Sequence, residues 1–232
     1  MRQSKLFKKL FSNDSNSVPD IFSPKYEEYL LKQYGNSDKI NNSITLLVIA
    51  DTHGTLDEDE FRQYMANKQY DICIMLGDHY NRDIDIILRC VDKSKIYGIK
   101  GNHDYDYLGD YDIPNINGNI IEINGIKILG MEGSFKYKPV DFPSFTQEDS
   151  ITFLEGKSKV DILVTHDKKF DYEKLKDPAH QGLIGITNYI FKNKIPIHIH
   201  GHIHESYTKK MINGTTEYSI FGYEIIKIDL NT

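Results

Sequence analysis

Short and almost wholly apolar runs recur along the chain, and polar residues close each of them. We interpret these runs as strands that are buried on both faces, and they are residues 43–50, 71–76, 95–99, 160–164 and 195–200. Between them, apolar residues recur at helical spacing in residues 56–68, 84–91, 146–155 and 183–191. Alternating buried strands and helices are typical of an α/β protein whose sheet contains parallel strands.

Other segments predict hairpins and loops. Asn124-Gly125 lies between two short apolar segments, and Asn213-Gly214 lies within residues 211–220. Because Asn-Gly favours the tight turns of hairpins, both segments are predicted to be hairpins. Residues 223–230 predict a closing strand. Two stretches without periodicity predict long loops, which are often functional, at residues 105–117 and 131–145.

The first 43 residues differ in character from the rest of the chain. We predict that residues 1–43 form a partly helical and flexible N-terminal extension, and that residues 44–232 form one domain. Residues 25–34 predict a helix within the extension. Residues 1–11 mix basic and apolar side chains, which fits either an amphipathic helix touching a membrane or partner, or a solvated tail. We prefer the tail, because a single short helix anchors weakly.

Composition narrows the class of protein. The net charge of −6 over 232 residues argues against a stable nucleic-acid complex, which needs a basic footprint. The two cysteines, Cys73 and Cys90, lie in apolar segments and are expected to be buried thiols, as in a reducing cytoplasm. No apolar run approaches the roughly 18 residues of a transmembrane helix.

The polar residues that close the buried runs are of types that bind cations and transfer protons. They are Asp51-Thr52-His53, Gly77-Asp78, Gly101-Asn102-His103-Asp104, His166 and Gly201-His202-Ile203-His204. Open α/β sheets place their chemistry at the carboxyl ends of strands. We therefore expect these side chains to meet at one rim of the sheet.

Seven of these side chains predict two cation sites that share one carboxylate. The first site consists of Asp51, His53, Asp78 and His204, and the second of Asp78, Asn102, His166 and His202. A bridging carboxylate can hold two cations about 3.5–4 Å apart. Mixed imidazole, carboxylate and amide ligands favour Mn²⁺, our first choice, with Fe, Zn²⁺ or Ni²⁺ as alternatives.

Such a pair of cations would clamp a phosphate and generate hydroxide from a shared water, which then attacks phosphorus in line. The leaving oxygen needs a proton, and His103 beside the ligand Asn102 is the predicted acid. Asp104 is predicted to orient the His103 imidazole, as a carboxylate does in a catalytic triad. Asn102 and His103 are also expected to contact the substrate.

These motifs, in this order and after these strands, resemble those of the calcineurin-like metallophosphoesterases over residues 44 to about 206. The resemblance implies a four-layer α/β/β/α sandwich with two mixed sheets, a dinuclear metal centre and phosphoester hydrolysis. It assigns the seven ligands to the same positions. It also implies that His103 supports the leaving group.

Two further residues are candidates for substrate binding. The segment from Gly77 to Arg82 is similar to the motif of protein serine/threonine phosphatases, in which arginine binds phosphate, but Asn81 stands where that motif has aspartate. Arg82 is therefore either a phosphate ligand or a solvated residue at a helix start. His180 resembles a histidine on the substrate side of the small phosphodiesterase branch.

We predict a phosphodiesterase, because residues 133–137 and 165–167 resemble that small branch. A phosphomonoesterase acting on proteins or small molecules is the alternative, and a non-catalytic scaffold or a nuclease on the same fold also remains open. A small molecule or nucleotide is the expected substrate. His198 and His200 alternate with isoleucines and are expected to be packed groups that support the site rather than ligands.

Overall fold

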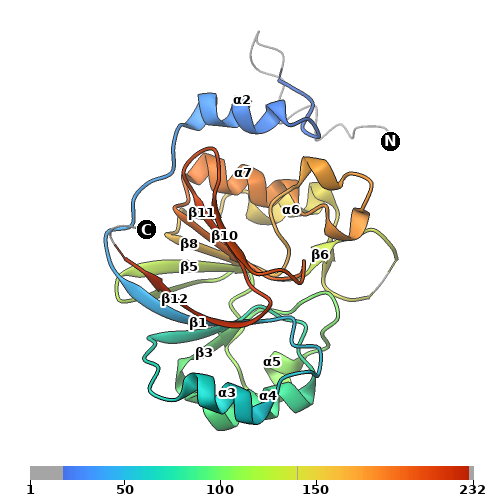
Figure 1. Ribbon diagram of the computed structural model, residues 1–232. Coiled ribbons are helices and arrows are strands. Elements are labelled where there is room, and N and C mark those ends of the chain that lie inside the picture. Colours follow the sequence, from blue (N-terminus) through green and yellow to red (C-terminus); the bar gives the residue numbers. More distant parts are fainter. Residues whose placement is uncertain (1–17, 140, 230–232) are drawn as a thin grey trace.

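The computed structural model describes residues 18–139 and 141–229, in which the longer strands form two separate sheets (Figure 1). The first sheet has the order β12-β1-β2-β3. Its strands are β1 (Ile44–Ala50), β2 (Ile72–Met75), β3 (Ile96–Gly98) and β12 (Gly222–Ile228). The first three are parallel and β12 is antiparallel to β1, so the sheet is mixed.

The second sheet has the order β10-β11-β9-β8-β5-β4. Its strands are β4 (Ile120–Ile123), β5 (Ile126–Met131), β8 (Ile162–Thr165), β9 (Ile197–His200), β10 (Tyr207–Lys210) and β11 (Thr216–Ser219). The central strands are parallel, and β4 and β10 pair antiparallel at the two edges. A small parallel pair, β6 (Ser134–Phe135) and β7 (Ser144–Phe145), lies in the loop that follows β5.

Helices cover the outer faces of both sheets and confirm the predicted four-layer sandwich (Figure 1). The first sheet carries α3 (Glu58–Met65), α4 (Asn81–Cys90) and α5 (Tyr107–Asp110). The second carries α6 (Gln147–Leu154) and α7 (Ile184–Asn193). Single 3₁₀ turns occur at η1 (Lys93–Lys95), η2 (Tyr172–Lys174) and η3 (Pro178–His180).

The apolar runs are explained by burial on both faces of each strand. On β1, Leu46 and Val48 belong to the core between the two sheets, whereas Leu47 and Ile49 belong to the core under α3 and α4. On β9, Ile197 and Ile199 face the central core. Because side chains alternate along a strand, His198 and His200 point to the opposite side, as predicted, and both are fully buried.

The helix predicted at residues 25–34 is present as α2 (Lys25–Tyr34), and it lies on α7 outside the four layers (Figure 1). Its Tyr26 and Leu30 are buried in the same apolar cluster as Ile190. The Glu27 carboxylate forms an ion pair of 2.7 Å with Lys169. The division into an extension and a domain stays a prediction, and residues 1–11 lie outside the described part of the chain.

The structure differs from the predicted elements where strands lie at edges. The hairpin around Asn213-Gly214 begins with β10 at Tyr207, earlier than predicted, because this exposed edge strand lacks an alternating apolar pattern. The predicted loop of residues 105–117 contains α5, and that of residues 131–145 contains β6 and β7.

None of the described helices is long and apolar enough to cross a membrane.

Replacing Leu30 tests whether α2 is part of the folded core. We expect Leu30→Ala to lower the free energy of unfolding by about 2–5 kcal/mol, because it removes a buried side chain from the α2–α7 contact. Urea unfolding of the full chain measures this change. The exposed Lys32→Ala on the same helix should stay within about 0.5 kcal/mol of the parent, and equal effects of the two changes would contradict the role of α2.

Candidate functional site

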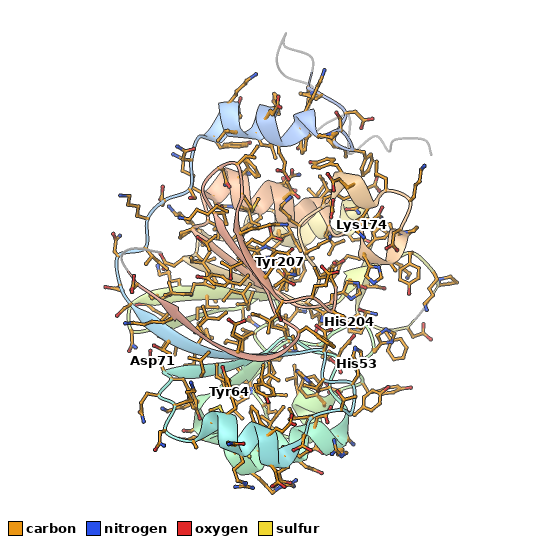
Figure 2. The ribbon with its side chains drawn as sticks, in the orientation of Figure 1. His53, Tyr64, Asp71, Lys174, His204 and Tyr207 are labelled. Atoms are coloured by element: carbon orange, nitrogen blue, oxygen red, sulfur yellow. The ribbon has the colours of Figure 1, made fainter. Side chains whose placement is uncertain are left out.

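The predicted site residues lie in loops that follow the carboxyl ends of strands from both sheets. Asp51 follows β1 and Asp78 lies just past β2, while His166 follows β8 and His202 lies just past β9. Figure 2 shows His53 and His204, which come from different sheets, close together at the same edge of the sandwich. The sandwich therefore brings together residues that are far apart in the sequence, such as Asp51 and His204.

Five of these residues have left-handed backbone conformations, which non-glycine residues rarely adopt. They are Asp51 (φ 52°), His53 (φ 45°), Asp78 (φ 58°), His202 (φ 70°) and His204 (φ 53°). Backbone strain of this kind costs about 1–3 kcal/mol per residue and clusters at functional sites. Its concentration here supports the interpretation of these turns as one site.

The first group of candidate ligands consists of Asp51, His53 and His204, with one ligand atom from each lying within 4.8 Å of the others. The Nε2 atoms of the two histidines are 3.0 Å apart, so both ring nitrogens face the same place. The Asp51 Oδ1 atom lies 3.8 Å from His204 Nε2. The other Asp51 oxygen accepts a hydrogen bond of 2.7 Å from the His202 backbone N–H.

The second group consists of Asp78, His166 and His202, again within 4.8 Å of one another. The Nδ1–H of His166 donates to the Leu76 carbonyl at 2.8 Å, which leaves Nε2 as its lone-pair nitrogen. That Nε2 lies 3.0 Å from Asn102 Oδ1, so the predicted amide ligand belongs to the same group. His202 donates from Nε2 to the Ala179 carbonyl at 2.8 Å, and its Nδ1 is the atom left for a cation.

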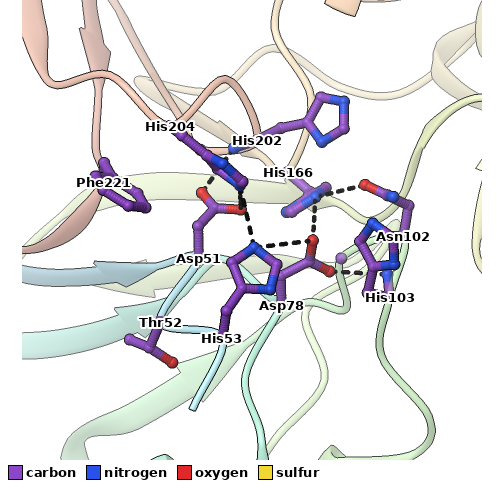
Figure 3. Close-up of polar contacts among 12 residues, drawn as sticks. Asp51, Thr52, His53, Asp78, Asn102, His103, His166, His202, His204 and Phe221 are labelled. Carbon is purple, nitrogen blue, oxygen red and sulfur yellow. Dashed lines mark hydrogen bonds and ion pairs between the residues drawn. The ribbon is translucent and has the colours of Figure 1, made fainter. Parts of the chain in front are cut away.

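The Asp78 carboxylate lies between the two groups (Figure 3). Its Oδ2 atom is 3.5 Å from His166 Nε2 and 3.9 Å from His53 Nε2. Its other oxygen accepts a hydrogen bond of 2.8 Å from the backbone N–H of His103. Asp78 is thus held in a position from which one carboxylate faces both sets of ligands.

Burial and neighbouring charge act differently on the two carboxylates. Burial, together with the charge of Asp78, raises the pKa of Asp51. Burial also raises the pKa of Asp78, but the nearby His166, the His103 backbone N–H and two further histidine rings outweigh it and hold that pKa below its usual range. Burial lowers the pKa of His166 to about 4, so its imidazole is neutral at pH 7, as a metal ligand must be.

The donor set fits a pair of divalent cations. Asp51 Oδ1 is buried and has no hydrogen-bond partner among the described residues, although an unpaired buried carboxylate oxygen is costly. A cation held by Asp51, His53 and His204 would supply the missing partner. Imidazole and carboxylate donors with one amide are typical of Mn²⁺, Fe and Zn²⁺.

Asp104 has different partners from those predicted. Its Oδ2 accepts hydrogen bonds of 2.7 Å from the backbone N–H groups of Asp78 and Gly101, and its Oδ1 accepts one of 2.9 Å from His79. Both oxygens are therefore occupied by backbone groups, and among the described residues no hydrogen bond joins Asp104 to the His103 ring. Burial and the charge of Asp78 raise the pKa of Asp104 to about 7.

Arg82 and His180, the two candidates for substrate contact, lie in different environments. The Nη1 of Arg82 donates to the backbone carbonyls of Gly54 and Leu56 and to Asp83, which supports its interpretation as a helix-start residue. His180 is hydrogen-bonded through Nδ1 to Asp177 at 2.9 Å. Its ring centroid lies 5.6 Å from that of His202, so it stands beside the second group.

A buried hydrogen-bonded pair behind the His202 loop, His200 and Glu217, was not predicted from the sequence. Glu217 on β11 is fully buried, and its Oε1 lies 3.0 Å from His200 Nε2. The other His200 nitrogen donates to the Gly201 carbonyl at 3.0 Å, one residue before the candidate ligand His202. Tyr207 also donates to Glu217, at 3.0 Å. The alternation around His200 indicated a packed group, but nothing in the sequence pointed to Glu217.

An aromatic neighbour of the first group was also missed. The Phe221 ring stacks on the His204 imidazole with centroids 5.1 Å apart. Phe221 lies in the tight turn between β11 and β12 and is 48% exposed. It carries no sequence signal, since its contact depends on how the two sheets meet.

Comparison with known proteins gives a family match and several similar folds. The sequence model of the family described as "Calcineurin-like phosphoesterase" matches residues 44–206 of this chain. A search of curated proteins gives no match.

Three solved structures illustrate the similarity of fold. The protein TT1561 of Thermus thermophilus is 11% identical, covers 81% of this chain and 99% of its own, and has a TM-score of 0.51. Phosphopantetheinyl hydrolase (PptH) from Mycobacterium tuberculosis is 12% identical over 79% of this chain and 91% of its own, with a TM-score of 0.55. The 5'-nucleotidase from Candida albicans is 12% identical over 84% of this chain and 53% of its own, with a TM-score of 0.53.

Replacing Glu217 tests whether the buried pair positions the His202 loop. We expect Glu217→Gln to weaken Mn²⁺ binding about 10–100-fold, because His200 loses the charged partner that holds it against the Gly201 carbonyl. Isothermal titration with Mn²⁺ measures the affinity. Glu122→Gln, an exposed change on β4 of the same sheet, is the control and should leave the affinity unchanged. Unaltered Mn²⁺ affinity in a folded Glu217→Gln protein would exclude the positioning role.

Proposed function

Because the chain belongs to the calcineurin-like phosphoesterase family, as the match over residues 44–206 shows, we propose that it is a phosphodiesterase that depends on two divalent cations. Asp51, His53, Asp78 and His204 would hold one cation, and Asp78, Asn102, His166 and His202 the other. Mn²⁺ is the proposed native ion, with Fe, Zn²⁺ and Ni²⁺ as alternatives.

One observation carries this proposal: Asp78 Oδ2 lies 3.5 Å from a nitrogen of one ligand group and 3.9 Å from a nitrogen of the other. A carboxylate in that position can serve both groups at once. When bound, the two cations would polarise the phosphate and lower the pKa of a water that attacks phosphorus.

The chain's own residues would complete the reaction around the phosphate. His103 is exposed, and its backbone N–H is fixed by Asp78 at 2.8 Å, so the ring projects from a rigid turn. We assign it the proton that the leaving oxygen requires. Asp104 acts by holding the turn through backbone N–H groups rather than by contact with the imidazole. His180 beside His202 remains a proposed substrate contact.

The distribution of arginine favours a diester over a monoester. A phosphomonoester carries up to two negative charges, and proteins usually recognise such groups with bidentate arginine. Of the described arginines, Arg62 and Arg89 pair with Glu58, and Arg82 is engaged by backbone carbonyls and Asp83. A diester, with one negative charge, makes a smaller demand on positive side chains.

We further propose that the substrate is a small molecule or nucleotide and that the protein acts in the cytoplasm. The described cysteines, Cys73 and Cys90, are both free thiols, which fits a reducing compartment.

A pair of chromogenic substrates tests the proposed reaction. With Mn²⁺ present, we expect kcat/KM for bis-p-nitrophenyl phosphate to exceed that for p-nitrophenyl phosphate by at least about tenfold, a difference of about 1.4 kcal/mol in the barrier. Release of p-nitrophenolate and the metal content per chain are the measurements. A preference for the monoester would support a phosphomonoesterase instead, and a chain with neither metal nor turnover would support a scaffold.

The role of His103 is tested by separating turnover from metal content. We expect His103→Ala to keep two cations per chain but to lose about 10²–10⁴-fold in kcat on bis-p-nitrophenyl phosphate, because it removes the proton donor and no ligand. Asn102→Ala, one residue away, is the contrasting variant and should weaken metal binding. Loss of cations from His103→Ala would contradict the assignment of this residue.

A further inference from the structure

A pocket of about 700 Å³ opens beside the loop that carries His103. Lys100, Tyr105, Glu132, Asp141, Phe142 and Phe145 contribute to its lining. A smaller cavity of about 60 Å³ is lined by Asn102 and His103 at one end and shares Phe142 and Ser144 with the pocket. The two spaces therefore lie on either side of Phe142 and Ser144, and the larger one adjoins the cavity that His103 lines.

The entrance to this pocket is aromatic. The Phe142 ring lies 6.4 Å from the His103 ring and 5.5 Å from the Tyr105 ring, to which it is nearly perpendicular at 74°. Tyr105 is 81% exposed, so its ring is open to a ligand. Flat ligands stack readily on such exposed rings, as bases do in single-stranded nucleic-acid sites.

The polar part of the lining is mainly acidic. Glu132, Asp106 and Asp141 line the pocket with one cation, Lys100, whose Nζ is 3.7 Å from Asp106. A phosphodiester has two ester substituents, and one of them would enter this pocket. A substituent that carried a second phosphate would be repelled by these carboxylates. The pocket therefore favours substituents that are uncharged or positively charged.

Within the described part of the chain, Glu132 in the pocket lining lacks a hydrogen-bond donor for one of its carboxylate oxygens. Its Oε2 atom is buried and has no hydrogen-bond partner among the described residues. Glu132 lines the pocket, and the terminal torsion of a glutamate is broad, so a small change of that torsion turns a carboxylate oxygen toward a ligand there. An oxygen of this kind is stabilised by an N–H donor, and a carboxylate accepts such bonds from the exocyclic amines of bases.

We propose that this pocket binds a nucleoside, which packs its base against Phe142 and donates an N–H from the base to Glu132. The volume suits a base with its sugar, since ligand pockets of drug-sized molecules span about 300–1,000 Å³. Because the pocket adjoins His103, the nucleoside is the leaving group of the phosphoester, and its oxygen receives the proton from His103. This orientation rests on the proposed function, whereas the nucleoside pocket itself does not.

Binding of nucleosides without phosphate tests the pocket separately from the metal centre. Adenosine and purine riboside differ in the 6-amino group alone, so they isolate the N–H donor. On the full chain with Mn²⁺, we expect isothermal titration to give an affinity for adenosine about tenfold higher than for purine riboside, the effect of one hydrogen bond to a charged acceptor. Ribose and choline should not bind. Equal affinities for the two nucleosides, or tighter binding of choline, would overturn the proposal.

Variants assign the effect to Glu132. Glu132→Met keeps the length of the side chain without an acceptor, and it should reduce adenosine affinity about tenfold while leaving purine riboside unchanged. Phe142→Ala should weaken both nucleosides, because it removes the stacking surface. Glu122→Gln, an exposed change on β4 outside the pocket lining, is the control and should change neither affinity. If Glu132→Met does not fold, the comparison of the two nucleosides on the parent chain still decides the proposal.

Turnover of bis-p-nitrophenyl phosphate tests the proposed reaction independently of the nucleoside pocket. Turnover of the diester without adenosine binding would overturn the nucleoside pocket and leave the phosphodiesterase standing. Adenosine binding that depends on Glu132, without any turnover, would support the pocket and overturn the proposed reaction. If both hold, adenosine should inhibit hydrolysis competitively in the parent and about tenfold less well in Glu132→Met.

Discussion

The candidate site depends on one buried carboxylate that ties two loops together through their backbones. Asp104 accepts hydrogen bonds from Asp78 and His79 in the loop after β2 and from Gly101 in the loop after β3. Asp78 also joins the two loops, because its Oδ1 accepts a hydrogen bond of 2.8 Å from the His103 backbone N–H. Each loop thus supplies a carboxylate to the backbone of the other. This reciprocal pairing sets the position of Asp78 between the two ligand groups before any cation binds.

The same pairing explains two glycines in these loops. A Cβ on Gly77 would lie 2.0 Å from the Gly101 nitrogen, and a Cβ on Gly101 would lie 2.1 Å from Asp78 Oδ1. The loops approach so closely that no side chain fits between them. Asp51, Asp78 and His202 then adopt left-handed backbone conformations, which rigid neighbours must stabilise at about 1–3 kcal/mol each. Strands buried on both faces, such as β1 and β9, provide that rigidity.

The sequence was sufficient for the parts of the site that depend on strand ends. Continuous apolar runs predicted β1, β2 and β9, and the polar residues after them gave the candidate ligands, because strand ends in parallel sheets meet at one edge. It was insufficient where a partner depends on how loops approach across the two sheets. The partners of Asp104, and the two carbonyls that Arg82 binds, are backbone groups, and these leave no trace in residue type. Glu217 is recognised as the partner of His200 only once β11 and β9 are paired in register.

The balance of charge in the site also depends on the fixed position of Asp78. Burial and the charge of Asp78 raise the pKa of Asp51, while the nearby histidines hold the pKa of Asp78 below its usual range. The pKa values of the two carboxylates are therefore shifted in opposite directions, although both side chains are buried. The lowered pKa of Asp78 keeps its carboxylate ionised at pH 7, whereas burial and the charge of Asp78 disfavour the ionised form of Asp51, which has an oxygen that is unpaired among the described residues. A cation at the first group would reverse this for Asp51, since a nearby positive charge stabilises the ionised carboxylate. Binding of a cation there would therefore be coupled to the release of a proton from Asp51.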